Sequence, residues 1–247
     1  MRIAIISDIH EDFESLEKAF ERMRRVGYDL LVCLGDITGF ASEFYSHKSN
    51  ANACLDLIKQ NAQIALAGNH DLFTSRRLPS YYAEKAIPEN WFELSISQQQ
   101  LLTGNKLWLY EDEVLPILTP DNLQYLQSLH EWEVLDTGTK KILFSHFVKP
   151  DMAGVSRWFP WQAGQMRQHF KFMEELDCRL AFTGHCHPEG LSLVSRHLWS
   201  KPSFEKTTLN NSPKIALIPA LVNNGKCVPG FIIFDAVTGQ ISPQMFT

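Results

Sequence analysis

The 247-residue sequence contains little cysteine and few excess charges of either sign. Its five cysteines are scattered and form no Cys-x-x-Cys pair, so neither a thiolate-rich metal site nor a disulfide framework is indicated. The net charge of −5 provides no general basic field of the kind that attracts a phosphate backbone. Nucleic acid is therefore an unexpected partner.

Long hydrophobic runs are also missing. The first ten residues, MRIAIISDIH, hold a short apolar run that ends at a charged residue, too short for a signal sequence or a membrane span. Hydrophobic residues make up 45% of the chain and charged residues 21%, which is typical of a globular protein with a sizeable core. We expect a cytoplasmic protein with free thiols and no membrane partner.

The first third of the chain alternates between strand and helix patterns. Residues 3–7, 29–34 and 63–67 are short apolar runs that predict buried strands. Apolar residues recur at helical spacing in 13–23 and 51–60. This alternation predicts parallel strands joined by crossover helices, with sites beyond the carboxyl ends of the strands.

The middle of the chain, about residues 72–136, is less regular and rich in aromatic residues. Thr119 and Pro120 predict a helix start, because threonine caps helices and proline fits the first turn. We expect a mostly helical insertion here, within a single domain that spans residues 1–247.

Strand character returns in the second half. Residues 141–144 and 180–183 predict buried strands, and a helix is expected near 162–176. From residue 191 onward, short strand-like runs are expected to complete a second sheet.

Polar motifs follow or interrupt the apolar segments at five places. They are SDIH at 7–10, GDITG at 35–39, GNHD at 68–71, SH at 145–146 and GHCH at 184–187. Singly, most such motifs are surface turns. Together they place oxygen and imidazole ligands at one edge of the sheets, a set that zinc, iron and manganese accept.

In this order the motifs resemble those of the calcineurin-like metallophosphoesterases, over residues 1–187. The GDITGFA stretch looks most like a bacterial branch whose motif resembles GDIVGYG, although the Asn-Pro-Gly-Ser turn of that branch is replaced by residues 218–223 here. The resemblance implies an α/β (α+β) fold, a four-layer α/β/β/α sandwich of two mixed sheets flanked by helices.

The resemblance also implies two divalent or trivalent metal ions, of Mn, Fe, Zn or Ni. One ligand set would be Asp8, His10, Asp36 and His187, and the other Asp36, Asn69, His146 and His185. Asp36 would bridge the ions, and a hydroxide between them would attack the phosphorus of a bound phosphate ester.

The catalytic residues implied by the resemblance are His70 and Asp71. His70 would face the substrate and protonate the leaving group, and Asp71 would orient His70 and raise its pKa. Neither is expected to bind metal.

The reaction expected is hydrolysis of a phosphate ester, most simply by a phosphomonoesterase or by a protein or nucleotide phosphatase. The alternatives are a phosphodiesterase acting on nucleotides, a catalytically idle metal-binding regulatory protein of the same fold, and a di-iron redox or sensing protein. The presence of every motif ligand and of His70 favours the enzyme.

The segment Ser156–Trp161 lies between two of the motifs and so invites two interpretations. Arg157 would grip a phosphate and the tryptophans would stack on a base, or the aromatic residues simply pack the insertion. Tyr81 and Tyr82 carry the same two interpretations. Packing is the preferred one for both segments, and for Cys186 as a small buried residue.

Overall fold

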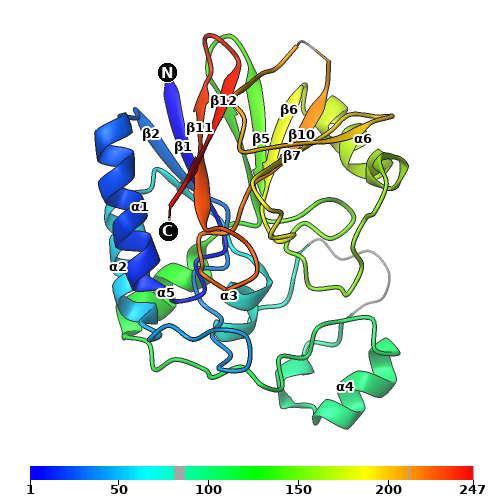
Figure 1. Ribbon diagram of the computed structural model, residues 1–247. Helices are drawn as coiled ribbons and strands as arrows, with labels where there is room; N and C mark the ends of the chain where they lie inside the picture. The colour runs from blue at the N-terminus through cyan, green and yellow to red at the C-terminus, as the bar shows by residue number, and fades with distance from the viewer. Residues whose placement is uncertain (81–86, 211, 247) are drawn as a thin grey trace.

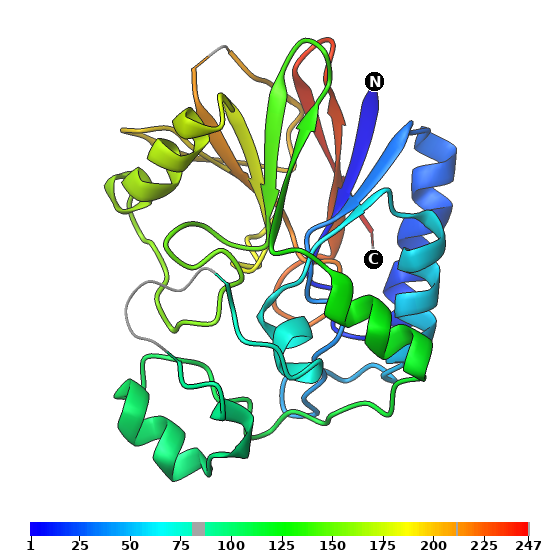
Figure 2. The same cartoon turned by 180° about the vertical axis from the view of Figure 1, so that it is seen from behind.

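The computed structural model describes residues 1–80, 87–210 and 212–246, so Tyr81 and Tyr82 lie outside the described residues. It contains two mixed β-sheets of six strands each, packed face to face, with helices on their outer faces (Figures 1 and 2). The predicted four-layer α/β/β/α sandwich is therefore confirmed. In the described ranges, none of the helices has the length and apolar character needed to span a membrane.

The first sheet has the strand order β3-β2-β1-β11-β12-β9. Its strands are β1 (Arg2–Ile6), β2 (Leu30–Cys33), β3 (Ile64–Ala65), β9 (Thr207–Thr208), β11 (Gly230–Asp235) and β12 (Gln240–Met245). β1, β2 and β3 pair in parallel, as the alternation of strands and helices predicts. The carboxyl ends of these three strands therefore meet at one edge.

The second sheet has the order β4-β5-β6-β10-β7-β8. Its strands are β4 (Trp132–Asp136), β5 (Lys141–Ser145), β6 (Leu180–Thr183), β7 (Leu191–Val194), β8 (Trp199–Ser203) and β10 (Lys214–Leu217). Its centre is parallel, because β6 pairs in parallel with both β5 and β10.

The C-terminal strands depart from the prediction. Of the strands described after residue 190, β7, β8 and β10 join the second sheet, whereas β9, β11 and β12 lie in the first, where β11 pairs antiparallel with β1. The apolar run of β11 is buried on both faces, with Phe231 facing the helices and Phe234 facing the other sheet. Such a strand needs cover on both sides, which the centre of the first sheet provides.

The helices are α1 (Phe13–Val26), α2 (Ala51–Asn61), α3 (Asn69–Thr74), α4 (Ile96–Thr103), α5 (Pro120–Ser128) and α6 (Arg167–Glu175), with 3₁₀ turns η1 (Trp91–Glu93) and η2 (Ala163–Met166). α1 begins where the carboxylate of Asp12 accepts a hydrogen bond from the backbone N–H of Ser15. α5 begins at Thr119 and Pro120, as predicted. Figures 1 and 2 show α1, α2 and α5 along the first sheet and α6 along the second.

Side-chain alternation along β1 explains the layers. Ile3 and Ile5 point between the sheets and pack in one cluster with Phe144 and Phe182 of the second sheet. Ile6 points the other way, into the cluster formed with the helices of the first sheet. Each of these side chains is fully buried, and burial contributes about 1.5–3 kcal/mol per large apolar side chain.

Between α3 and β4 the chain runs through η1, α4 and α5 with long irregular connections. Residues 106–114 of this region, here called the 106–114 segment, attach to the rest of the protein at both ends. Leu107 forms an isolated β-bridge with Ser156, and Val114 forms one with Phe40. The segment is thereby held against the loops that follow β2 and β5.

His169 of α6 is a core histidine and gives the protein an acid-sensitive element. The side chain is fully buried, and its Nδ1 accepts a hydrogen bond from the backbone N–H of Lys149 at 3.1 Å. Burial, aided by the charge of Lys149, lowers the pKa of His169 to about 3. Below about pH 6.5 the unfolded chain binds a proton that the folded chain does not, so folding stability falls as the pH falls.

We expect the low pKa of His169 to lower the free energy of unfolding by about 2 kcal/mol between pH 6.5 and pH 5. In His169→Asn the amide oxygen replaces Nδ1 as acceptor but does not titrate. Urea unfolding of the metal-free proteins at pH 7.5 and 5.0 should show the smaller loss of stability in the variant. Equal losses in the two proteins would show that His169 is not the titrating group.

Candidate metal centre

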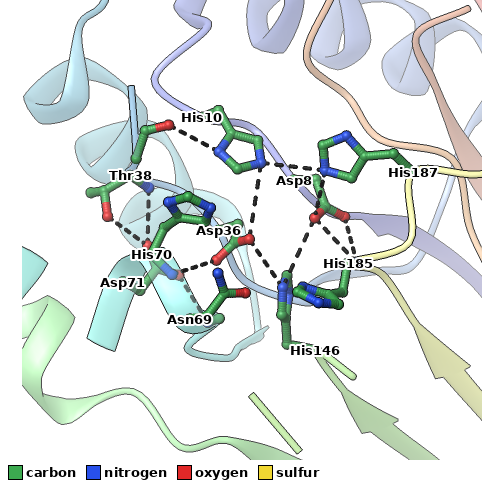
Figure 3. Close-up of polar contacts among 12 residues, drawn as sticks. Asp8, His10, Asp36, Thr38, Asn69, His70, Asp71, His146, His185 and His187 are labelled. Carbon is green, nitrogen blue, oxygen red and sulfur yellow. Dashed lines mark hydrogen bonds and ion pairs between the residues drawn. The ribbon is translucent and has the colours of Figure 1, made fainter. Parts of the chain in front are cut away.

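The seven predicted ligand side chains come together where strands of both sheets end (Figure 3). The ligand atoms of the aspartates and histidines among them form clusters in which all members lie within 4.8 Å of one another. The clusters in the described residues are Asp8, His10 and His187; Asp36, His146 and His185; and His10, Asp36 and His70. Each of the first two contains three of the four residues of one predicted set, without Asp36 in the first and without Asn69 in the second, and the third places His70 near His10 and Asp36.

The backbone at this edge is unusually constrained. Five of the predicted ligands have positive φ angles: Asp8 (56°), His10 (46°), Asp36 (51°), His185 (62°) and His187 (43°). Such left-handed conformations cost about 1–3 kcal/mol each outside glycine and concentrate at functional sites. They turn the chain sharply at the strand ends and so direct these side chains toward a common point.

Two motif glycines make this close approach possible. A Cβ at Gly184 would collide with the hydroxyl of Ser7 and the carboxylate of Asp8, and one at Gly68 would collide with the carboxylate of Asp36. Glycine is thus required at both positions so that the loops can approach the two carboxylates.

Two of the histidines are oriented by backbone carbonyls. Nδ1–H of His10 donates to the carbonyl of Gly39 at 2.9 Å, and Nδ1–H of His146 donates to that of Leu34 at 3.1 Å. This tautomer leaves each Nε2 as the atom that faces the cluster, and Nε2 of His146 lies 3.0 Å from a carboxylate oxygen of Asp36. Metal-binding histidines are commonly held in this way.

Nε2 of His185 and Oδ1 of Asn69 are among the buried polar atoms at the centre that have no hydrogen-bond partner in the described part of the chain. The amide of Asn69 is oriented by its own Nδ2, which donates to the hydroxyl of Tyr110 at 2.9 Å. Leaving such atoms unpaired costs about 1–3 kcal/mol each, which a bound cation would offset. The donor set therefore fits a metal ion.

The protonation states also suit metal binding. Burial alone would raise the pKa of Asp8 and Asp36, but the neighbouring histidines hold both well below the usual range. Burial lowers the pKa of His10 and His185 to about 3, so both rings are neutral. Burial would do the same to His146, but Asp36 and Asp8 outweigh it and raise its pKa to about 9. A metal ion would replace that proton.

Asp71 has only part of its predicted role, because it helps to raise the pKa of His70 but does not hold its ring. Its carboxylate accepts hydrogen bonds from the backbone N–H groups of Ile37, Thr38 and Gly68 and from the hydroxyl of Thr38, at 2.9–3.1 Å. It holds the GDITG loop against the start of α3 and makes no hydrogen bond to His70. The prediction that Asp71 orients His70 is wrong, because adjacent residues of a helix point in different directions.

The acid that contacts His70 is Glu113 of the 106–114 segment. Its Oε2 lies 2.6 Å from Nδ1 of His70, and its side chain is only 3% exposed. Burial would lower the pKa of His70, but Glu113 and then Asp36 outweigh it and raise that pKa to about 9, with a smaller contribution from Asp71. Neither Glu113 nor Tyr110 belongs to a recognisable motif.

Paired carboxylates and imidazoles at the strand ends of a double-sheet sandwich define a protein with a candidate metal centre. The chain belongs to the calcineurin-like phosphoesterase family, whose model matches residues 1–189. That match includes every one of the clustered residues.

Among known proteins, an uncharacterized protein of Methanocaldococcus jannaschii is 27% identical over 146 residues, which is 58% of this chain and 48% of that protein. The chain thus spans about half the length of this curated relative. A metallophosphoesterase from Sphaerobacter thermophilus superposes with a TM-score of 0.68 at 20% identity, covering 100% of this chain and 88% of that one. A putative diadenosine tetraphosphatase gives 0.51 at 15% identity, covering 100% and 94%. At these identities, the two structures show a shared fold.

Proposed function

We propose that the protein is a metal-dependent phosphoesterase that hydrolyses phosphomonoesters. The observation that carries the proposal is the convergence of the aspartates and histidines of five motifs on one buried centre. Nε2 of His185 and Oδ1 of Asn69 lie at this centre and have no hydrogen-bond partner among the described residues. Membership of the calcineurin-like phosphoesterase family supports the same reaction class.

The side chains would divide between two ions that share Asp36. The first set is Asp8, His10, Asp36 and His187, and the second is Asp36, Asn69, His146 and His185. When bound, the ions would polarise the phosphate oxygens and lower the pKa of a water molecule toward neutrality. Asn69 adds a neutral ligand, which keeps the centre positive toward a phosphate anion.

His70 would handle the leaving group. Glu113 accepts a hydrogen bond from Nδ1–H of His70, which leaves Nε2 of His70 to face the cavity beside the clusters. From there it would donate a proton to the departing oxygen or stabilise its charge. Glu113 would be a positioning residue that acts through His70.

Glu113→Gln is expected to lower kcat about 10- to 100-fold, because losing the partner of a functional histidine typically has an effect of this size. KM and the metal content should change little, since Glu113 is outside both ligand sets. The matched control is Glu93→Gln, an exposed acid of the same region of the chain. If metal were lost together with activity, Glu113 would be a structural support for the centre instead.

The proposal is tested by loading the protein with Mn²⁺, measuring bound metal, and assaying p-nitrophenyl phosphate and bis-p-nitrophenyl phosphate. We expect metal-dependent turnover, with the monoester hydrolysed faster than the diester. A protein that binds metal but hydrolyses neither ester would be the catalytically idle regulatory protein. Faster hydrolysis of the diester would identify a phosphodiesterase.

A further inference from the structure

A cavity of about 500 Å³ opens directly on the candidate metal centre, and Asn69, His70, His185 and His187 form its floor. A phosphate held at the centre would therefore direct the rest of its ester into this space. Away from the centre, five aromatic side chains line the walls. The rings come from Phe44, Tyr45, Trp108, Tyr110 and Phe159.

Several of these rings are placed for a ligand and not for the core. Phe44 is 57% exposed and Phe159 is 42% exposed, although both line the cavity. Phe159 stacks on His185 with a centroid distance of 5.0 Å and an interplanar angle of 4°. Of the Ser156–Trp161 segment, Trp158 packs against Phe147 as the packing interpretation expects, whereas Phe159 touches Phe147 with one side and leaves much of its ring exposed. Exposed apolar rings beside a polar centre mark a binding surface.

Charged groups on the cavity wall limit what the leaving group carries. The guanidinium of Arg157 lies 5.0 Å from the ring centroid of Trp108, and its backbone N–H is held by the carbonyl of Lys106 at 2.8 Å. Glu111 and Asp112 line the same cavity. One cation beside two acids does not favour an additional phosphate group, whereas carboxylates accept hydrogen bonds from hydroxyl groups readily.

We propose that the substrate is a phosphomonoester whose leaving group is a neutral alcohol with a planar ring, as in a nucleoside monophosphate. The ring would stack among the aromatic side chains, and the hydroxyl groups would donate to Glu111 and Asp112. Hydrolysis breaks the P–O ester bond: the oxygen of water joins phosphorus, and the alcohol leaves with a proton. This inference rests on the proposed phosphoesterase activity.

The test compares adenosine 5′-monophosphate with glycerol 2-phosphate, an alkyl ester of similar charge, on the Mn²⁺-loaded protein. We expect kcat/KM to be at least about ten-fold higher for the nucleotide, the size expected for one base–ring stacking contact. Phe44→Leu should lower this ratio about ten-fold, because it keeps apolar bulk but removes the ring. Phe204→Leu, an exposed ring outside the cavity, is the matched control and should leave the ratio unchanged.

The role of the acidic residues on the cavity wall can be tested separately. Adenosine 5′-diphosphate should be a poorer substrate than the monophosphate, and Asp112→Asn should narrow that difference. Equal kcat/KM for the nucleotide and glycerol 2-phosphate, or a ratio that Phe44→Leu does not change, would overturn the inference while leaving the proposed function intact. Hydrolysis of p-nitrophenyl phosphate but of neither ester would overturn this inference alone, and hydrolysis of none of the three would overturn the proposed function with it.

Discussion

Replacing Asp36 with asparagine is expected to weaken the binding of both metal ions by more than about 100-fold and to abolish measurable turnover. Loss of partners that merely support a ligand already costs 10–100-fold in metal affinity, so loss of a shared ligand should cost more. Asp36 belongs to two of the three clusters, and its carboxylate lies 3.0 Å from Nε2 of His146. Asparagine keeps the shape of the side chain but removes the negative charge.

The measurement is metal content after equilibration with Mn²⁺, together with turnover of p-nitrophenyl phosphate. Asp56→Asn, an exposed acid on α2, is the matched control and should behave as the unchanged protein does. Circular dichroism verifies that Asp36→Asn is folded. A folded variant that still bound two ions would show that Asp36 does not bridge them.

Replacing His70 with alanine should lower turnover without lowering the metal content. Turnover is expected to fall by about 10²–10⁴-fold, the usual contribution of general acid–base catalysis, while both ions remain bound. The ring of His70 lies at the cavity and is held by Glu113, but it belongs to neither proposed ligand set.

Because the ring of His70 also lies within reach of His10 and Asp36, metal content must be measured on the same samples as turnover. His197→Ala, which removes an exposed histidine, controls for non-specific effects. Metal lost in proportion to activity would make His70 a ligand. Unchanged turnover would leave it without a catalytic role.

Much of the fold could be predicted from the sequence because its signals are local. The alternation of apolar strands with helices in the first 67 residues correctly indicated parallel pairing of β1, β2 and β3. The destination of β11 could not be predicted in this way. It pairs with β1, more than 220 residues earlier (Ile3 opposite Phe234), and no local pattern tells a strand which sheet it will join.

The candidate site could likewise be predicted only where its sequence signals are local. The side chains of the five motifs could be placed together, because each motif follows a strand and the strands end at one edge. Glu113 and Tyr110 could not, because they come from an irregular segment whose place depends on distant contacts such as its bridges to Phe40 and Ser156. Asp71 was wrongly expected to orient His70, because neighbours in sequence on a short helix point in different directions.

The proposed activity depends on a centre that binds two ions through a shared carboxylate. Titration of the metal-free protein with Mn²⁺ by calorimetry, with p-nitrophenyl phosphate turnover followed in parallel, tests this most directly. We predict two ions per chain and turnover that returns as the centre fills. Binding of one ion or none, or turnover that persists after removal of metal, would contradict it.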